Sequence, residues 1–172
     1  MEDWKVEERI MQDLVRILRE GEHSLVIYGN EKSLNESSEK NLSTGADSEK
    51  KISTYDGRGV SDLFRLLNKE PEILEDAYIA DKIVGKGAAA LISLAKVREV
   101  YADIITLSAQ AMLELHDVRV RYGRMVPHIT SRNGTGFCPV EIRCLPCKTP
   151  EECLVQIKGF IEEMKSKTNE TR

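Results

Sequence analysis

Long apolar runs are absent from this chain of 172 residues. No segment approaches the roughly 20 consecutive apolar residues that a membrane-spanning helix needs. Residues 1–20 are charged and lack the continuous apolar stretch of a secretory signal peptide. These two absences predict a cytoplasmic location and no membrane partner.

An excess of positive charge is also lacking. Lys and Arg number 25 against 29 Asp and Glu, which gives a formal net charge of −4. General binding to nucleic acid or to an anionic membrane surface is favoured by a basic surface, so the composition argues against both. The length and the 41% of hydrophobic residues fit one soluble domain with its own core.

The N-terminal residues 1–22 have the pattern of an amphipathic helix. Ile10, Leu14, Ile17 and Leu18 recur at helical spacing, and Gly21 follows as a stop signal, which predicts a helix over 3–20. Two short β runs then flank residues 30–51, which are rich in Ser, Glu, Lys and Asn. We expect a hairpin whose loop is a flexible polar insertion.

The rest of the chain alternates between helical and strand patterns. A helix over 60–70 is followed by a region at 72–96 that we interpret as helical in two pieces, the second starting near Ala80. A strand (98–106), a helix (107–117) and a second strand (118–126) imply a parallel pair with a right-handed crossover. A final helix starts at Thr149 and Pro150, and residues 166–172 are expected as a disordered tail. This order predicts an α/β protein, a three-layer α/β/α domain with a small mixed sheet.

Two motifs, "ADKIVGKGAAALI" and "VPHITSRNGTGFCPVE", together resemble an uncharacterised bacterial domain family placed in the cytidine-deaminase-like fold. The similarity covers 23–165 apart from the polar insertion, and it implies that fold without supplying an activity. In this fold the start of the helix that we place near Ala80 lines the active-site cleft. The resemblance therefore implies that Asp81 and Lys82 are pocket residues, with Lys86 on the same helix face.

The residues that zinc-dependent deamination needs are missing from the corresponding stretches of this sequence. This chemistry needs a His or Cys ligand with a Glu two positions on, and then a P-C-x-x-C motif at the start of a later helix. The corresponding stretches, "ADKIV" and "LSAQAM", contain no such ligands. The sequence therefore argues against a hydrolytic deaminase of the usual kind, although the fold can persist with a rebuilt site.

The stretch "SRNGTGFCPVE" is the main candidate site. Cys138 precedes Pro139, a residue favoured at the first helical position, so Cys138 is expected at a helix N-cap, where the helix dipole favours a thiolate. Cys138 is a candidate nucleophile, with His128 as a hypothetical base, and Glu141 is a candidate acid or base. The alternative is that Cys138 packs in the core, and whether the protein is an enzyme stays open.

The glycine-punctuated loop before Cys138 has the composition of an anion site. Its backbone N–H groups and an arginine suit a small anionic or nucleotide-like ligand. The candidate residues are Arg132, Asn133, Gly134, Thr135 and Gly136. In the alternative interpretation, Gly134 and Gly136 only shape a turn.

Four cysteines form the pattern C-x5-C-x2-C-x5-C, namely Cys138, Cys144, Cys147 and Cys153. We favour no metal and no cofactor here. The alternative is a structural zinc or iron–sulfur site in a protein-interaction module, or a CxxC redox pair. A homodimer through a sheet edge or a helix face is compatible with the fold, but no sequence feature fixes the oligomeric state.

Overall fold

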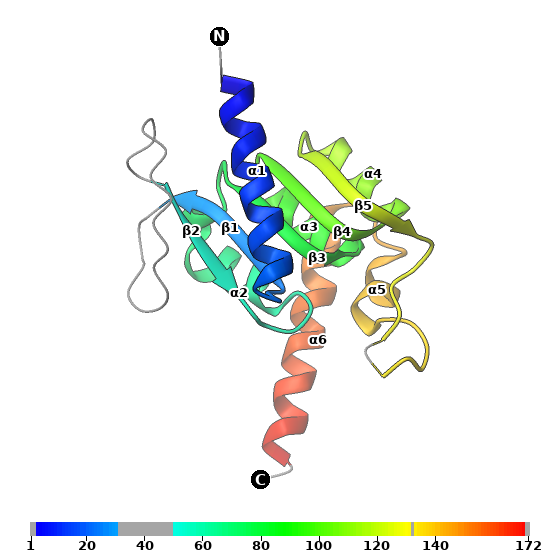
Figure 1. Cartoon of the computed structure of the whole chain (residues 1–172). Helices are drawn as coiled ribbons and strands as arrows, with labels where there is room; N and C mark the ends of the chain where they lie inside the picture. The colour runs from blue at the N-terminus through cyan, green and yellow to red at the C-terminus, as the bar shows by residue number, and fades with distance from the viewer. Residues whose placement is uncertain (1–2, 31–49, 132, 171–172) are drawn as a thin grey trace.

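A computed structural model describes residues 3–30, 50–131 and 133–170 of the chain (Figure 1). Within these ranges five strands form one sheet in the order β2-β1-β3-β4-β5. The strands are β1 (Leu25–Asn30), β2 (Lys50–Tyr55), β3 (Tyr78–Val84), β4 (Glu99–Thr106) and β5 (Arg119–Val126). β1 is antiparallel to β2 and β3, whereas β3, β4 and β5 are mutually parallel. The sheet is therefore mixed, as predicted.

Helices cover both faces of the sheet, which confirms the three-layer α/β/α architecture. Their bounds are α1 (Asp3–Glu20), α2 (Ser61–Lys69), the 3-10 turn η1 (Pro71–Ile73), α3 (Lys86–Leu94), α4 (Leu107–Leu115), α5 (Pro139–Cys144) and α6 (Pro150–Glu170). α1 crosses one face, and α2, α3 and α4 lie on the other (Figure 1). α5 and α6 pack against α3 and against each other.

The apolar stripe of α1 is buried as its spacing predicts. Ile10, Met11, Leu14 and Leu18 pack on the side chains that β1 and β3 present to this face. The larger core lies on the opposite face, where Leu63 and Leu66 of α2 and the small and apolar residues of α3 meet the sheet. No helix among the described residues is long and apolar enough to cross a bilayer.

The region at 72–96 is not helical in two pieces, and this prediction is wrong. η1 and a short turn lead into β3, which lies between β1 and β4, and the helix α3 begins only at Lys86. The sequence "YIADKIV" holds three β-branched residues and a tyrosine, which suit a strand bonded on both sides. Asp81 and Lys82 therefore lie on a strand, and Lys82 shares no helix face with Lys86.

The predicted hairpin and the start of the last helix are confirmed, whereas the predicted disordered tail is not. β1 and β2 pair as the expected hairpin, with Leu25 opposite Tyr55, while the polar insertion falls almost entirely at 31–49, outside the described residues. α6 begins at the predicted cap, where the Thr149 hydroxyl accepts a hydrogen bond from the Glu152 amide at 3.2 Å. It continues to Glu170, so residues 166–170 are helical and not the disordered tail that we expected.

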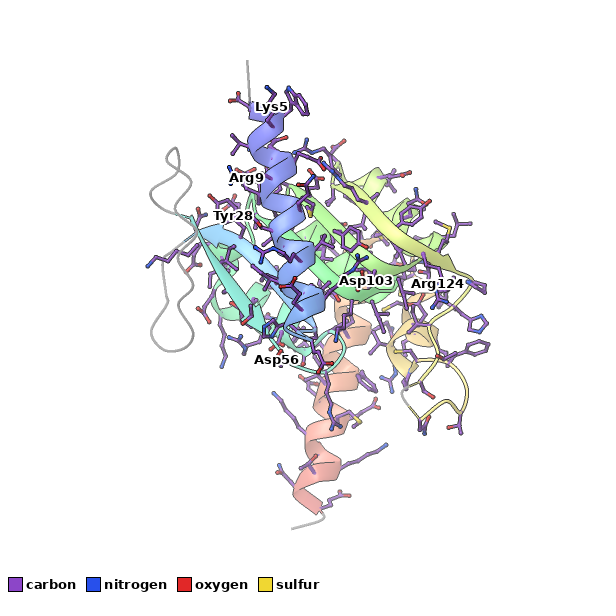
Figure 2. All side chains as sticks on the ribbon, viewed as in Figure 1. Lys5, Arg9, Tyr28, Asp56, Asp103 and Arg124 are labelled. Atoms are coloured by element: carbon purple, nitrogen blue, oxygen red, sulfur yellow. The ribbon has the colours of Figure 1, made fainter. Side chains whose placement is uncertain are left out.

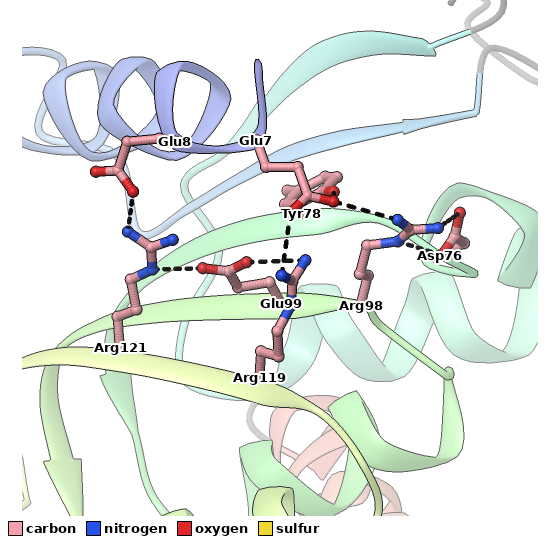
Figure 3. A network of polar contacts seen from close by, with 8 residues as sticks. All are labelled: Glu7, Glu8, Asp76, Tyr78, Arg98, Glu99, Arg119 and Arg121. Atoms are coloured by element: carbon pink, nitrogen blue, oxygen red, sulfur yellow. Dashed lines mark hydrogen bonds and ion pairs between the residues drawn. The ribbon is translucent and has the colours of Figure 1, made fainter. Parts of the chain in front are cut away.

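β5 is an edge strand, and most of its side chains are exposed, including Arg124 (Figure 2). Two other arginines of this strand reach back over the sheet. Arg119 and Arg121 lie 3.2 and 2.5 Å from the carboxylate of Glu99, whose side chain is almost completely buried. Their guanidinium groups also bind Glu7 and Glu8 of α1, at 3.0 and 2.5 Å (Figure 3). The network ties α1 to β4 and β5.

We expect Glu99→Gln to lower the free energy of unfolding by about 2 kcal/mol, because hydrogen bonds to charged groups contribute roughly 1.5–3 kcal/mol each. The amides of α1 should also exchange faster with solvent. Urea denaturation and hydrogen exchange measure the two effects. Glu163→Gln, which removes an exposed ion pair with Arg143, is the matched control and should change stability much less. Equal losses in the two variants would contradict the role of the network.

Candidate functional site

A pocket of about 840 Å³ lies at the end of the sheet where β3 meets α3. Its walls come from the loop before α2, the second half of β3, the first turn of α3, the segments 129–131 and 138–141, and the last turns of α6. These last turns extend beyond the sheet (Figure 1). Four predicted site residues, Asp81, Lys82, Cys138 and Glu141, line this pocket together.

Asp81 and Glu141 are the acidic residues of the pocket lining, and both are buried. The Asp81 side chain is 9% exposed, and its Oδ1 accepts a hydrogen bond from the Ile83 amide at 3.1 Å. Burial raises the pKa of Asp81 to about 7, and the nearby carboxylates of Asp103 and Asp62 act in the same direction. Lys82 does not neutralise it, because its Nζ donates to the Glu22 carbonyl at 3.0 Å.

Glu141 is also buried, but its carboxylate has more hydrogen-bond partners than that of Asp81. Its Oε2 accepts a hydrogen bond from the Lys86 amide at the start of α3, at 2.8 Å, and its Oε1 accepts one from the Thr106 hydroxyl at 3.4 Å. The same hydroxyl caps α4 by accepting from the Ala109 amide at 3.3 Å. Burial raises the pKa of Glu141, and these hydrogen bonds partly oppose it. The carboxylate thus fills the anion position at the N-terminus of α3.

Gly85 makes this contact possible. A Cβ atom at this position would lie 2.2 Å from the Glu141 Oε2, so any side chain would displace the carboxylate. Gly87 similarly admits Val140, whose side chain would lie 2.7 Å from an added Cβ. Gly85 and Gly87 therefore leave the space that the segment 140–141 occupies.

Cys138 is the N-cap of α5, as predicted, and is half-buried in the pocket wall. Its amide donates to the Ile129 carbonyl at 2.9 Å, which closes the preceding loop. His128, its hypothetical base, packs edge-on against Phe137 with ring centroids 4.4 Å apart and is not among the residues that line the pocket. The geometry therefore offers Cys138 a place in the pocket but gives no support to this histidine.

The loop residues Asn133–Gly136 do not reach the pocket lining. They are exposed, and the Asn133 side chain accepts hydrogen bonds from the Ser131 hydroxyl and, at 3.1 Å, from the Thr135 amide. Gly134 and Gly136 have positive φ angles of 72° and 89°, which favour glycine. The Gly134 amide donates to the Ser131 carbonyl. The amides of Gly134 and Thr135, which we expected to bind an anion, are thus both used within the turn. Arg132 lies outside the described residues.

Lys86 is also directed away from the pocket. Its Nζ donates to the carbonyl oxygens of Leu145 and Cys147, at 2.7 and 2.5 Å, beyond the end of α5. The prediction that Lys86 belongs to the ligand site therefore finds no support in its geometry. Its position instead joins α3 to the segment between α5 and α6.

Three of the four cysteines are core residues. Cys144, Cys147 and Cys153 are buried free thiols, and the Sγ atoms of Cys144 and Cys153 each approach the other residue's carbonyl oxygen, at 4.0 and 3.9 Å. Burial raises the pKa of Cys144 strongly and that of Cys153 to about 11. Among the described residues, no group of three or more His, Cys, Asp or Glu side chains is placed to hold a metal ion.

Most of the pocket's apolar wall was not predicted from the sequence. Phe160, Ile161 and Met164 of α6 line the pocket, and Met164 is 48% exposed. Apolar residues at this helical spacing are typical of a stripe that faces a core. The signal for a pocket is that the stripe continues past Ile157, the last fully buried residue of α6. Arg58 and Lys165 also line the pocket.

The family profile that matches residues 33–161 is described as "TM1506: Domain of unknown function (DUF1893)". The chain belongs to this family. The crystal structure of a DUF1893 family protein (TM1506) from Thermotoga maritima is similar, with a TM-score of 0.70 and 20% sequence identity, over 88% of this chain and 89% of that chain. At this identity the likeness shows the fold. A search of curated proteins gives no match. The resemblance to an uncharacterised domain family is thereby confirmed.

In this DUF1893 domain, we expect Glu141→Ala to lower the free energy of unfolding by about 2 kcal/mol, because it removes a helix cap and leaves buried donors unpaired. Glu141→Gln keeps an oxygen for the Lys86 amide and should cost much less. Urea denaturation at pH 7 measures both, and hydrogen exchange at Lys86 reports the cap itself. An alanine variant as stable as the wild type would show that the carboxylate does not hold α3.

Proposed function

We propose that this domain binds a small ligand with an anionic group, of nucleotide-like size, in the pocket between β3, α3 and α6. The observation that carries the proposal is the pocket itself, about 840 Å³ in volume, with an apolar wall and a few polar groups that converge on it. Sites for small organic ligands have this size and character. The apolar wall includes Val60, Ile83, Ile129, Phe160, Ile161 and Met164.

The anion is expected at the basic groups of the lining. Arg58 lies in the turn before α2 and Lys165 on α6, and both are exposed. Neither has an ion-pair partner within the part of the chain that the structure describes, so both are available to a phosphate or carboxylate. This role replaces the one first predicted for Asn133–Gly136, whose turn faces solvent. Lys82 is the third cation of the lining.

The fold that the resemblance implies is compatible with this location and supplies no reaction. The hairpin, the parallel strands and the flanking helices are compatible with the fold that the resemblance implies. With the helix starts now placed, "VGKGAAA" at α3 and "TLSAQA" at α4 still contain no His, Cys or Glu. Zinc-dependent deamination therefore lacks its ligands at both helices. Cys138 remains a hypothetical nucleophile, and a cytoplasmic location and a homodimer remain predictions.

Isothermal titration calorimetry with nucleoside monophosphates, the matching nucleosides and inorganic phosphate tests the proposal. We expect at least one monophosphate to bind with a Kd below about 1 mM, and about tenfold more tightly than its nucleoside, which corresponds to roughly 1.4 kcal/mol. The double variant Arg58→Ala, Lys165→Ala should lose that preference. Lys158→Ala, which removes an exposed cation of α6 outside the pocket, is the matched control.

Two outcomes would contradict the proposal. One is that none of the monophosphates binds at millimolar concentration. The other is that Lys158→Ala weakens binding as much as the double variant, because general attraction between charges would then explain the affinity.

A further inference from the structure

Asp81 is an incompletely paired buried carboxyl group. It is more than nine-tenths buried, and the hydrogen bond from the Ile83 amide engages only one of its two oxygens. The second oxygen, Oδ2, has no hydrogen-bond partner among the described residues. Among the described residues, the fully enclosed side-chain oxygen without a hydrogen bond is Oε2 of Glu99. The Oδ2 atom of Asp81 is therefore not fully enclosed by the protein. Asp81 also lines the pocket, which is therefore the space that its Oδ2 is expected to face.

The surroundings of this carboxyl group are acidic. Asp62 on α2 and Asp103 on β4 both disfavour a negative charge on Asp81. The nearest lysines in the sequence are engaged elsewhere, Lys82 by the Glu22 carbonyl and Lys86 by carbonyl groups beyond α5. A buried carboxyl group without a cation or a full set of donors destabilises a fold, and one hydrogen bond leaves most of that cost in place.

The contrast with Glu141 shows that the fold can satisfy a buried carboxylate. Both oxygens of Glu141 accept hydrogen bonds, from the Lys86 amide and from the Thr106 hydroxyl. Asp81 lies in the same pocket lining and lacks the second partner. The missing partner is therefore expected from whatever occupies the pocket.

We propose that Asp81 binds a nitrogen group with N–H donors, an amidine or amino group, at the inner end of the pocket's ligand. Such a group supplies the donor that Oδ2 lacks, and a cationic one also pairs with the negative charge of the Asp81 carboxylate itself. The inference rests on the proposed function, because it concerns the same pocket. The ligand then has two different ends, N–H donors at Asp81 and an anionic group at Arg58 and Lys165. A nucleotide with an amino-substituted base has both.

Three probes of one shape separate this inference from the anion site. Benzamidine carries four N–H donors and a positive charge, benzamide carries two N–H donors without charge, and acetophenone carries neither N–H donors nor charge. None of them contains an anionic group, so their order does not depend on binding at Arg58 and Lys165. Ligand-observed NMR titration at pH 8 should give affinities in the order benzamidine, benzamide, acetophenone, with at least a tenfold difference between the first and the last.

Asp81→Asn should remove most of the difference between benzamidine and acetophenone. The asparagine oxygen can still accept from the Ile83 amide, so the variant should fold, and a thermal melt checks this. Glu162→Gln is the matched control, because it removes one negative charge from the exposed surface of α6, outside the pocket. It should leave the tenfold preference unchanged. If Asp81→Asn did not fold, the order of the three probes on the wild-type protein would still decide.

The inference would be overturned by acetophenone binding as tightly as benzamidine to the wild type, or by an unchanged preference in a folded Asp81→Asn variant. If either result is obtained and nucleotides still bind through Arg58 and Lys165, the proposed function holds and only the inference about Asp81 fails. A benzamidine preference that depends on Asp81, without any nucleotide binding, would instead remove the anionic half of the proposal.

Discussion

The carboxylate of Glu141 at the N-terminus of α3 is the contact on which the pocket depends. It joins the first amide of α3 to the hydroxyl of Thr106, the N-cap of α4, and Gly85 leaves the space for it. The segment before it folds back on itself, since Thr130 and Phe137 form an isolated β-bridge. One buried side chain therefore fixes a wall of the pocket against two helix ends. Helix N-termini attract anions, and here the protein provides the anion itself, so the ligand site that we propose lies toward Asp81 and α6.

The two buried carboxyl groups of the pocket differ in what the fold provides for them. Glu141 has donors on both oxygens and stabilises the structure around it, whereas Asp81 has one donor, acidic neighbours and a second oxygen without a hydrogen bond, which we infer to face the pocket. A folded-state pKa raised above the unfolded value means that ionisation of Asp81 destabilises the fold as the pH rises through about 7. Groups that cost stability without a structural benefit are characteristic of functional sites, because function retains them.

Much of the fold was predictable because its signals are local. The stripe of α1, the hairpin, the β4–α4–β5 unit and the cap of α6 each follow from spacing or from a few neighbouring residues. β3 was missed because seven residues flanked by helical patterns carry little periodicity, and only its pairing with β1 and β4 makes it a strand. Four of the predicted site residues line one pocket, namely Asp81, Lys82, Cys138 and Glu141. The role of Glu141 as a cap of α3 could not be predicted, because its contact with Lys86 spans more than fifty residues of sequence. The glycine-rich loop had the composition of an anion site, and its own side chains fill the role that a ligand would have taken.

The titration of Asp81 tests the account most directly. Carboxyl ¹³C chemical shifts, assigned with Asp81→Asn and followed from pH 3 to 9 on the ligand-free protein, give its pKa in the folded state. The account predicts a midpoint near 7, because burial and the charges of Asp62 and Asp103 disfavour the carboxylate. Addition of a cationic probe such as benzamidine should lower that midpoint. A midpoint near 4 in the free protein would show a carboxylate already solvated or paired, and it would contradict the claim that Asp81 awaits a partner in the pocket.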